Sequence, residues 1–273
     1  MSKAINLHRD AIDMLKETSR TFFIPISHLS SGLQEAVTSA YLCMRAIDEI
    51  EDHPQLQLES KYNLLYSISL FLQNPSCNKE LMSIFHPYKS ILPEVTLRLG
   101  DWIQLCPPTI VENILNTTST MAKGMADWAL KEWRIKNEED LNQYTFYVAG
   151  LVGLMLSDIW KWHDGTETNK PLAIAFGRGL QSVNIIRNRT EDLERGVDFF
   201  PDGWELKDMF LYARHNLALA DVYLKDIKPG PILNFCKIPL ALAYGTLDVL
   251  TEGKEKMSRA DVTEVVNRVV GKL

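Results

Sequence analysis

Cysteine is scarce in this 273-residue sequence, and its four copies lie far apart. They are Cys43, Cys77, Cys106 and Cys236, and no two of them form a CxxC pair. This spacing argues against a zinc site and predicts free, mostly buried thiols in a reducing compartment. The six histidines are equally scattered, so we expect none of them to ligate a metal.

Several motifs of common chemistries are also missing. The sequence contains no GxxxxGK[ST] phosphate loop, no HExxH and no GxSxG. The fragment Gly177-Arg178-Gly179 lies in a helical context, so it does not indicate a dinucleotide site. The net charge of −6 argues against a nucleic-acid partner, which would require a basic stripe.

No apolar run is long enough to cross a bilayer. The longest, residues 147–159, is too short and contains Ser157 and Asp158. The first ten residues lack the apolar core of a secretory signal. We therefore expect a cytoplasmic protein with no encoded membrane anchor.

An alternating strand pattern is absent as well, and the apolar period is helical almost throughout. We expect Pro25 to end or kink the first helix, and Ser30 or Ser31, with Gln34, to cap the next one. The sequence predicts one all-α bundle domain over residues 1–273, with helices near residues 7–18, 40–52, 58–73, 78–86, 92–105, 111–134, 141–163, 172–194, 205–225, 231–251 and from 259 onward.

One helix, over residues 40–52, places polar side chains on a mostly apolar background. Tyr41, Arg45, Asp48 and Asp52 are three or four residues apart and therefore share one face. A solvated acidic helix end with i,i+4 ion pairs would explain them. Alternatively, the two carboxylates hold Mg²⁺, which prefers oxygen ligands on a rigid element. We expect the neighbouring Glu49 and Glu51 to face water.

A second polar row consists of Gln181, Asn184, Asn188 and Asp192, again three or four residues apart. Burying such a row costs free energy unless its groups are satisfied. If the two rows faced each other across a bundle, they would form an oxygen-lined pocket for Mg²⁺ and diphosphate. Arginines could bind the phosphate oxygens there in bidentate fashion.

Two glycines interrupt the most apolar helix, at Gly150 and Gly153. Each costs the helix about 1 kcal/mol relative to alanine. They indicate either close packing of two helices or space for a long apolar ligand.

Four blocks of the sequence together resemble the squalene/phytoene synthase family, bacterial dehydrosqualene synthases most closely. Residues 19–22 resemble its S-[RK]-[ST]-F element, and residues 41–52 retain its R-x-x-D-x-x-x-D motif unaltered. Residues 147–153 resemble its Y-x-V-A-G-x-V-G helix, and residues 184–192 resemble its second motif, N-[IL]-[IL]-R-D-x-x-E-D. A weaker similarity to K-[IV]-S-R lies at residues 256–259.

The resemblance implies a helical isoprenoid-synthase fold with a central prenyl channel, which uses Mg²⁺ and an allylic substrate such as farnesyl diphosphate. It implies that the metal ligands are Asp48, Asp52, Asn184, Asn188 and Asp192, which together with Tyr41 are the catalytic residues. It implies substrate contacts from Ser19, Arg20, Phe22, Arg45, Tyr147, Val148, Gly150, Leu151, Gln181, Arg187 and Arg259. NADPH is expected only if the protein is a squalene synthase.

The second motif departs from the family at Asn188, where an aspartate is expected. The change removes a unit charge, and a unit pair 4 Å apart is worth about 4 kcal/mol near an effective dielectric of 20. Metal binding by this motif should therefore be weaker, which would impair coupling of two substrates more than ionisation of one. On this argument we predict a farnesyl diphosphate phosphatase that releases farnesol and diphosphate.

Two alternatives remain open. The first is a head-to-head C30 prenyl transferase of the squalene, dehydrosqualene or phytoene synthase type. The second is a catalytically silent protein that binds prenyl lipids. In every case the expected ligand is a prenyl diphosphate or prenyl lipid. Such a ligand is compatible with peripheral contact between the protein and a membrane. We expect the protein to be a monomer or a homodimer.

Overall fold

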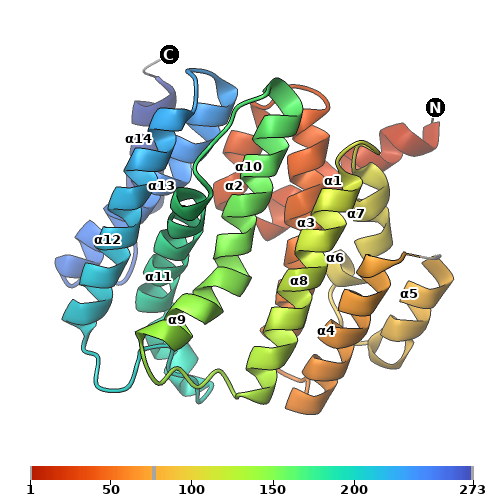
Figure 1. Cartoon of the computed structure of the whole chain (residues 1–273), viewed down its shortest axis with the longest axis horizontal. Helices are drawn as coiled ribbons and strands as arrows, with labels where there is room; N and C mark the ends of the chain where they lie inside the picture. Colours follow the sequence, from red (N-terminus) through yellow and green to blue (C-terminus); the bar gives the residue numbers. More distant parts are fainter. Residues whose placement is uncertain (1, 76–77, 272–273) are drawn as a thin grey trace. The chain divides into compact units, whose positions relative to one another are not determined.

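The computed structural model describes residues 2–75 and 78–271, and within these ranges all regular secondary structure is helical (Figure 1). The chain divides into two compact units, Met1–Glu132 and Trp133–Leu273. The predicted all-α class is confirmed. The prediction of one domain over residues 1–273 stays a prediction.

In the first unit, α3 (Leu33–Glu51) lies at the centre of the packing. Its neighbours are α1 (Ser2–Thr18), α2 (Arg20–Ser27), α4 (Leu58–Gln73), α6 (Glu94–Leu97), α7 (Leu99–Leu105) and α8 (Val111–Leu130). The helix α5 (Asn78–Phe85) packs against α4 and is followed by a short 3₁₀ turn, η1 (His86–Tyr88). The indoles of Trp102 and Trp128 are fully buried in this unit, so α3 is held by a close-packed core.

A serine, rather than the proline, interrupts the first helical segment. The Ser19 hydroxyl accepts a hydrogen bond from the Phe22 amide at 2.9 Å and caps α2. Pro25 lies inside α2, so the prediction that it ends or kinks the first helix is wrong. The break falls at Ser19 because a capping hydroxyl satisfies an amide that the start of a helix leaves free.

The start of α3 also differs from the prediction. Its N-cap is Gly32, whose φ of +84° suits a glycine, rather than Ser30 or Ser31. The carboxylate that accepts from the Gly32 amide belongs to Glu35 and not to Gln34. A glutamate one position further along thus takes the role assigned to Gln34, because the true cap also lies further along.

Two predicted helices are shorter or broken in the structure. The expected helix over 92–105 divides into α6 and α7 at Arg98. The helix expected to reach residue 134 ends at Leu130, and Glu132 and Trp133 follow with φ of +53° and +51°. Left-handed backbone at two consecutive residues other than glycine is unfavourable, so apolar periodicity alone did not indicate this ending.

In the second unit, α11 (Lys170–Glu194) takes the central position. It contacts α9 (Glu138–Thr145), the π-helical turn η2 (Phe146–Gly150), α10 (Leu151–Asp164), α12 (Leu206–Tyr223) and α13 (Pro231–Thr251). A 3₁₀ turn, η3 (Leu224–Asp226), follows α12, and α14 (Arg259–Val270) packs on α13. The predicted helix over 141–163 is therefore three elements, with a π-helical turn in its middle.

The glycines of this unit allow backbones to approach closely. A Cβ atom on Gly153 would lie 2.1 Å from the Ala173 carbonyl oxygen, and one on Gly177 would lie 2.1 Å from that of Ala149. Real Cβ atoms do not tolerate such contacts, so α11 can pack against η2 and α10 only because side chains are missing here. Of the two explanations given for Gly153, close helix packing is the one that the structure supports.

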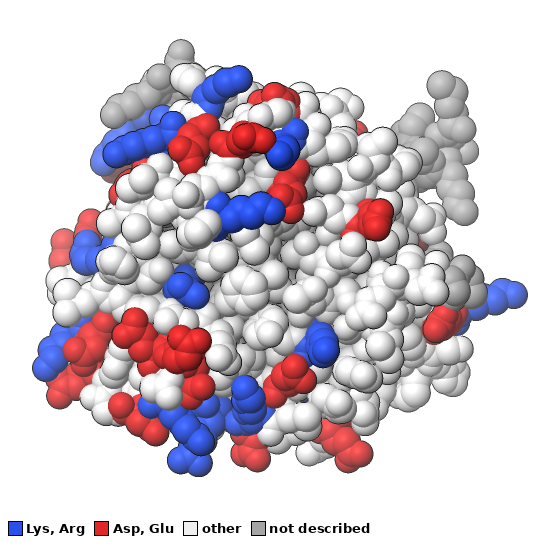
Figure 2. Space-filling model, in the orientation of Figure 1, with Lys and Arg blue, Asp and Glu red and all other residues white. Residues whose placement is uncertain are grey.

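One helix among the described residues, α13, is long and apolar enough to cross a membrane by length and composition. Of its most apolar stretch, 56% is buried within the protein, and the expectation that no apolar stretch is long enough to cross a bilayer is wrong by this measure. Cys43, Cys106 and Cys236 are buried free thiols, as predicted, and Cys77 lies outside the described residues. On the face shown in Figure 2, lysines and arginines are interspersed with acidic residues.

Candidate functional site

The polar face of α3 forms as its spacing predicts. The Arg45 Nη1 donates to the Asp48 Oδ2 at 2.6 Å, and Nη2 of the same guanidinium pairs with Glu49. Asp52 follows Asp48 by one turn and is the exposed C-cap of the helix. Two carboxylates thus lie one turn apart beyond an arginine that is itself half-buried.

This arrangement changes the acidity of Asp48. Burial, together with the negative charge of Asp52, raises the pKa of Asp48 to about 7, although the Arg45 guanidinium acts in the opposite direction. Burial and the like charge of Asp52 therefore both disfavour ionisation of Asp48 beside an ionised Asp52. A cation at this position would relieve that repulsion.

The acidic neighbours of this face do not both point to water. Glu51 is 4% exposed, and the Lys61 ammonium of α4 donates to its backbone carbonyl. Glu49 is half-buried and paired with Arg45. The prediction that Glu49 and Glu51 face water is therefore wrong, because α4 covers one side of the helix end and Arg45 engages the other.

The residues predicted to surround the substrate at this helix lie close together. The Tyr41 hydroxyl donates to the Thr18 carbonyl at 3.0 Å, and its ring centroid lies 6.0 Å from that of Phe22. Burial raises the pKa of Tyr41, so its phenol stays protonated at neutral pH. Ser19 is buried as the cap of α2, whereas the side chain of Arg20 lies outside the described residues.

The polar row of α11 has a different character. The Asn184 amide donates to Gln181 Oε1 at 3.4 Å. The Asn188 Oδ1 accepts from Arg187 Nε at 3.0 Å, and the buried Asp192 forms an ion pair with Arg195. Arginines therefore engage the oxygens of Asn188 and Asp192.

The residues predicted to contact the prenyl tail lie on the π-helical turn and directly after it. Tyr147, Val148 and Gly150 belong to η2, and Leu151 begins α10. A Cβ atom on Gly150 would lie 3.1 Å from Ile174 Cγ2 of α11. Gly150 thus faces packed protein on that side, and its role at a tail site stays a prediction.

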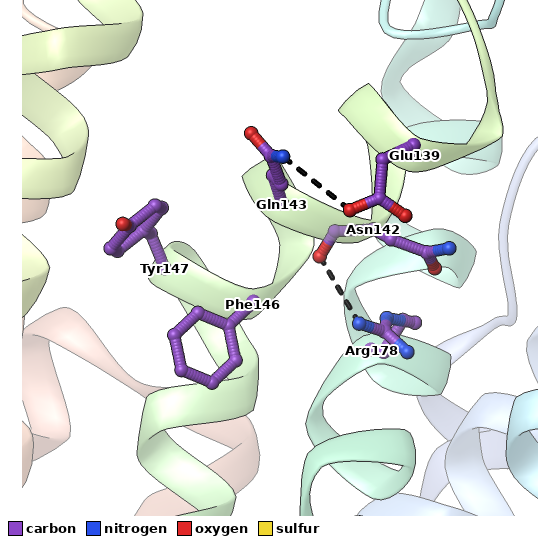
Figure 3. A pocket seen from close by; sticks show the side chains of 6 residues that line it. All are labelled: Glu139, Asn142, Gln143, Phe146, Tyr147 and Arg178. Atoms are coloured by element: carbon purple, nitrogen blue, oxygen red, sulfur yellow. Dashed lines mark hydrogen bonds between the residues drawn. The ribbon is translucent and has the colours of Figure 1, made fainter.

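A hollow of about 480 Å³ opens beside η2 (Figure 3). It combines aromatic rings, amides and one charge of each sign, and its lining residues are Glu139, Asn142, Gln143, Phe146, Tyr147 and Arg178. The Arg178 guanidinium reaches the last turn of α9, where it donates to Asn142 and Thr145. Tyr147 is the only one of the lining residues that the sequence predicted.

Comparison with known proteins identifies the family. A model of the family described as squalene/phytoene synthase matches residues 15–207, which include both polar rows. The chain belongs to the squalene/phytoene synthase family.

Relatives and solved structures agree with this membership. Squalene synthase of Schizosaccharomyces pombe is 30% identical over 88% of the chain and 58% of the relative, and that of Dictyostelium discoideum is 31% identical over 86% and 62%. The chain thus spans about three fifths of the length of these curated relatives.

Among solved structures, the complex of TcSQS with the ligand BPH1237 has a TM-score of 0.80 at 22% identity, over 97% of this chain and 86% of that one. A ligand complex of a dehydrosqualene synthase has a TM-score of 0.68 at 17% identity, over 99% and 98%. These likenesses confirm the predicted isoprenoid-synthase fold.

The family membership raises the question whether this chain's residues fit Mg²⁺. Asp48 and Asp52 fit it, because a cation would offset the repulsion between their two carboxylates, and Mg²⁺ in enzymes is held by one or two carboxylates plus substrate phosphates. Among the described residues, no three His, Cys, Asp or Glu side chains converge on one point, so phosphate oxygens would have to complete the coordination. Asn188 and Asp192 of α11 fit less well, because arginines already engage them.

Two predicted phosphate-binding arginines are exposed in the structure. Arg187 is exposed, with its Nε directed at Asn188. Arg259 starts α14, which packs on α13, and its side chain is exposed. Their roles in this family member stay predictions.

The sequence did not lead us to predict Arg178 as a site residue, although its spacing to the second polar row indicates it. Arg178 precedes Gln181 by three residues, so it lies one turn earlier, beside the same polar row. It stands between Gly177 and Gly179, and we considered this triplet only as a fragment of a dinucleotide motif. Glu139 and Gln143 also precede the predicted Tyr147 in steps of four residues, and Asn142 follows Glu139 by three, so the same periodicity could have marked them.

Proposed function

We propose that the protein acts on allylic prenyl diphosphates with Mg²⁺, and that it couples two of them head to head. The carboxylate pair on α3 carries this proposal, because Asp48 and Asp52 lie one turn apart beside Arg45 in a chain whose residues 15–207 match the family. The curated relatives are squalene synthases, which supports coupling in preference to other reactions of the same substrate.

In the proposed reaction, the side chains of α3 hold and neutralise the diphosphate. Asp48 and Asp52 would bind Mg²⁺, which supplies electrostatic stabilisation of the departing diphosphate. Arg45, already beside Asp48, would donate to phosphate oxygens. Tyr41 keeps its proton, since burial raises its pKa, and would have to leave the Thr18 carbonyl to donate its one hydrogen bond to a diphosphate oxygen.

Coupling makes further demands on the site. The allylic cation left by the first substrate must meet the alkene of a second, and loss of a proton then closes a cyclopropane ring that still carries one diphosphate. Water must also stay excluded after this second diphosphate departs, until the resulting carbocation accepts a hydride from NADPH or loses a proton. We assign contacts with the prenyl tails to Phe22 in the first unit and, in the second, to the half-buried Tyr147 and Val148 and the buried Leu151, which are aromatic or aliphatic.

A second candidate is hydrolysis of farnesyl diphosphate to farnesol and diphosphate. The observation that favours it is Asn188, an uncharged amide whose oxygen is engaged by Arg187 at 3.0 Å. A motif with less negative charge binds Mg²⁺ more weakly, which would hinder the second ionisation more than the first. Water that adds to the allylic cation then yields the alcohol.

The deciding experiment is product analysis of the purified protein. Farnesyl diphosphate labelled in the prenyl chain is incubated with Mg²⁺, with and without NADPH, and the extracted lipids are identified by mass spectrometry. A C30 hydrocarbon supports coupling, and its dependence on NADPH separates squalene from dehydrosqualene-type products. Farnesol alone supports the second candidate.

The same experiment tests the remaining alternative. Unchanged substrate that nevertheless binds to the protein contradicts both enzymatic proposals and indicates a prenyl-lipid binding protein. The matched control is the Asp48→Asn, Asp52→Asn double variant, which should form neither product.

A further inference from the structure

The helix that carries the predicted tail residues changes its hydrogen-bonding pattern at one point. Up to Thr145 the segment is α-helical, and over Phe146–Gly150 it is π-helical. The Leu151 amide donates to the Phe146 carbonyl, five residues earlier, before the α-helix resumes. Single π-helical turns are rare and occur frequently at functional sites, so contacts from other elements are expected to hold this one in place.

Arg178 of α11 provides such a contact at the junction. Its Nη2 donates to the Asn142 carbonyl at 3.1 Å, and its Nε donates to the Thr145 hydroxyl at 3.3 Å. Both acceptors belong to the last turn of α9, directly before the π-helical turn begins. One guanidinium therefore spans the turn in which the hydrogen-bonding pattern changes.

A tyrosine of α12 supports the same junction from another direction. The Tyr212 hydroxyl donates to the side-chain oxygen of Asn142 at 2.6 Å. Burial raises the pKa of Tyr212 to about 12, so this donor keeps its proton throughout the physiological range. Asn142 thus accepts from α11 through its carbonyl and from α12 through its side chain.

The residues that follow the junction are those predicted to bind the prenyl tail. Tyr147 and Val148 lie within η2, and Leu151 comes directly after it. If the turn became α-helical, these side chains would rotate relative to α10, because an α-helical turn contains fewer residues. Tyr147 also lines the hollow that Arg178 borders, as Figure 3 shows.

We propose that Arg178 is a positioning residue for the prenyl-tail site. It fixes the junction between α9 and η2 and so sets the direction of Tyr147 and Val148. The proposal rests on the proposed function only in taking these residues to bind the tail. It concerns binding of the substrate more than ionisation, since Arg178 is not placed among the residues that hold the diphosphate.

The test compares two substitutions of Arg178 with one of Arg214. Arg178→Met keeps the length of the side chain but removes its donors, and Arg178→Lys restores one donor. The control Arg214→Met removes an arginine of α12 whose Nη2 lies 3.1 Å from Asp248 in the same unit. Thr145→Val removes the acceptor of the Nε bond together with the hydroxyl's own hydrogen bond to the Leu141 carbonyl at 2.6 Å, and it serves as a second variant should Arg178→Met fail to fold.

Three readouts are needed. The first is KM and kcat with farnesyl diphosphate. The second is the Kd for farnesyl thiodiphosphate, an unreactive analogue. The third is hydrogen exchange of the peptide over residues 142–151, which requires no ligand or activity. We expect Arg178→Met to raise KM and Kd about tenfold with little change in kcat, and to raise exchange in that peptide. Arg178→Lys should recover part of each effect.

The outcomes separate this inference from the proposed function. If the unmodified protein forms no product, the proposed function fails, and local exchange together with analogue binding still decides the role of Arg178. If Arg178→Met behaves like Arg214→Met in KM, Kd and exchange, the inference is wrong. It is also wrong if exchange rises uniformly over the second unit and Arg178→Lys recovers nothing, because Arg178 would then only stabilise the fold.

Discussion

The polar rows of α3 and α11 use the same helical spacing but opposite chemistry. On α3, Asp48 and Asp52 present carboxylates one turn apart, and Arg45 is the nearest cation. On α11, three of the four residues in the row are amides, and the oxygens of Asn188 and Asp192 are engaged by arginines. The first row therefore offers two carboxylates to a metal ion, whereas the second offers one carboxylate, which is already paired with Arg195.

This difference shows that backbone geometry and side-chain charge can be separated within one family. Both rows form at the spacing that the sequence predicts, so the helices that carry the chemistry are intact. What changes is the charge at a single position of α11. Four experiments test the charges of the two rows and the packing that holds α11, from the largest expected effect to the smallest.

Removing the charge of α3 should have the largest effect. We expect Asp48→Asn combined with Asp52→Asn to lower kcat/KM for farnesyl diphosphate about a thousandfold, because Mg²⁺ would lose its carboxylate ligands. Steady-state kinetics at saturating Mg²⁺ measure this, with Asp127→Asn on the exposed side of α8 as the control. A loss of less than about tenfold would mean that α3 does not hold the metal.

The packing that holds α11 can be tested by adding one carbon. A Cβ atom on Gly177 would lie 2.1 Å from the Ala149 carbonyl oxygen, so Gly177→Ala should lower the free energy of unfolding by about 1–3 kcal/mol. In Gly245→Ala the added atom meets the flexible end of Met257 at 3.1 Å, and stability should hardly change. Urea titration of both variants gives the comparison, and equal stabilities would refute the close contact.

Restoring the missing negative charge on α11 should strengthen the binding of Mg²⁺ by its polar row. We expect Asn188→Asp to lower the Mg²⁺ concentration needed for half-maximal rate about tenfold, equivalent to about 1.4 kcal/mol. The ratio of C30 product to farnesol should rise as well. Asn116→Asp, on the exposed face of α8, makes the same charge change elsewhere. No difference between these variants would show that position 188 does not determine the outcome.

The acidity of Asp48 predicts a smaller effect on stability. Because folding raises the pKa of Asp48 from about 3.9 to about 7, the folded metal-free protein binds this proton more tightly than the unfolded chain does. The contribution of Asp48 to folding stability is therefore present at low pH and is lost as the pH rises from the unfolded to the folded pKa. With about a third of the side chain exposed, solvent screening reduces the effect to about 1 kcal/mol.

Asp48→Asn should remove the loss of folding stability that the unmodified protein suffers as the pH rises. Thermal unfolding in EDTA should show the variant about 2–4 °C more stable than the unmodified protein at pH 8, with a smaller difference at pH 5. A difference that is equal at both pH values would mean that Asp48 titrates normally in the fold.

Periodicity predicted the fold well wherever a helix ends at a strong signal. The bounds of α4 and α13 agree with the sequence, because Asn74-Pro75 follows α4 and Pro231 begins α13. Endings that depend on tertiary contacts were not predictable, as at Glu132 and Trp133. The π-helical turn could not be recognised either, since its residues have an ordinary apolar helical pattern.

Most of the candidate site could be predicted from spacing, because i, i+3 and i+4 positions share a face whatever surrounds them. The position of Asp48 is of this kind. The burial of Glu51 and the contacts of Arg178 depend on neighbouring helices, which no local pattern reveals. For residues whose burial or contacts depend on neighbouring helices, the structure adds the most information to the sequence.

The most direct test of the account is a mass balance on farnesyl diphosphate with Mg²⁺ and the unmodified protein. Released diphosphate and extracted lipid are measured in the same sample, beside the Asp48→Asn, Asp52→Asn variant. The account predicts that diphosphate appears together with a C30 product and that both disappear in the variant. Diphosphate release that accompanies farnesol alone, or release that survives in the variant, would contradict it.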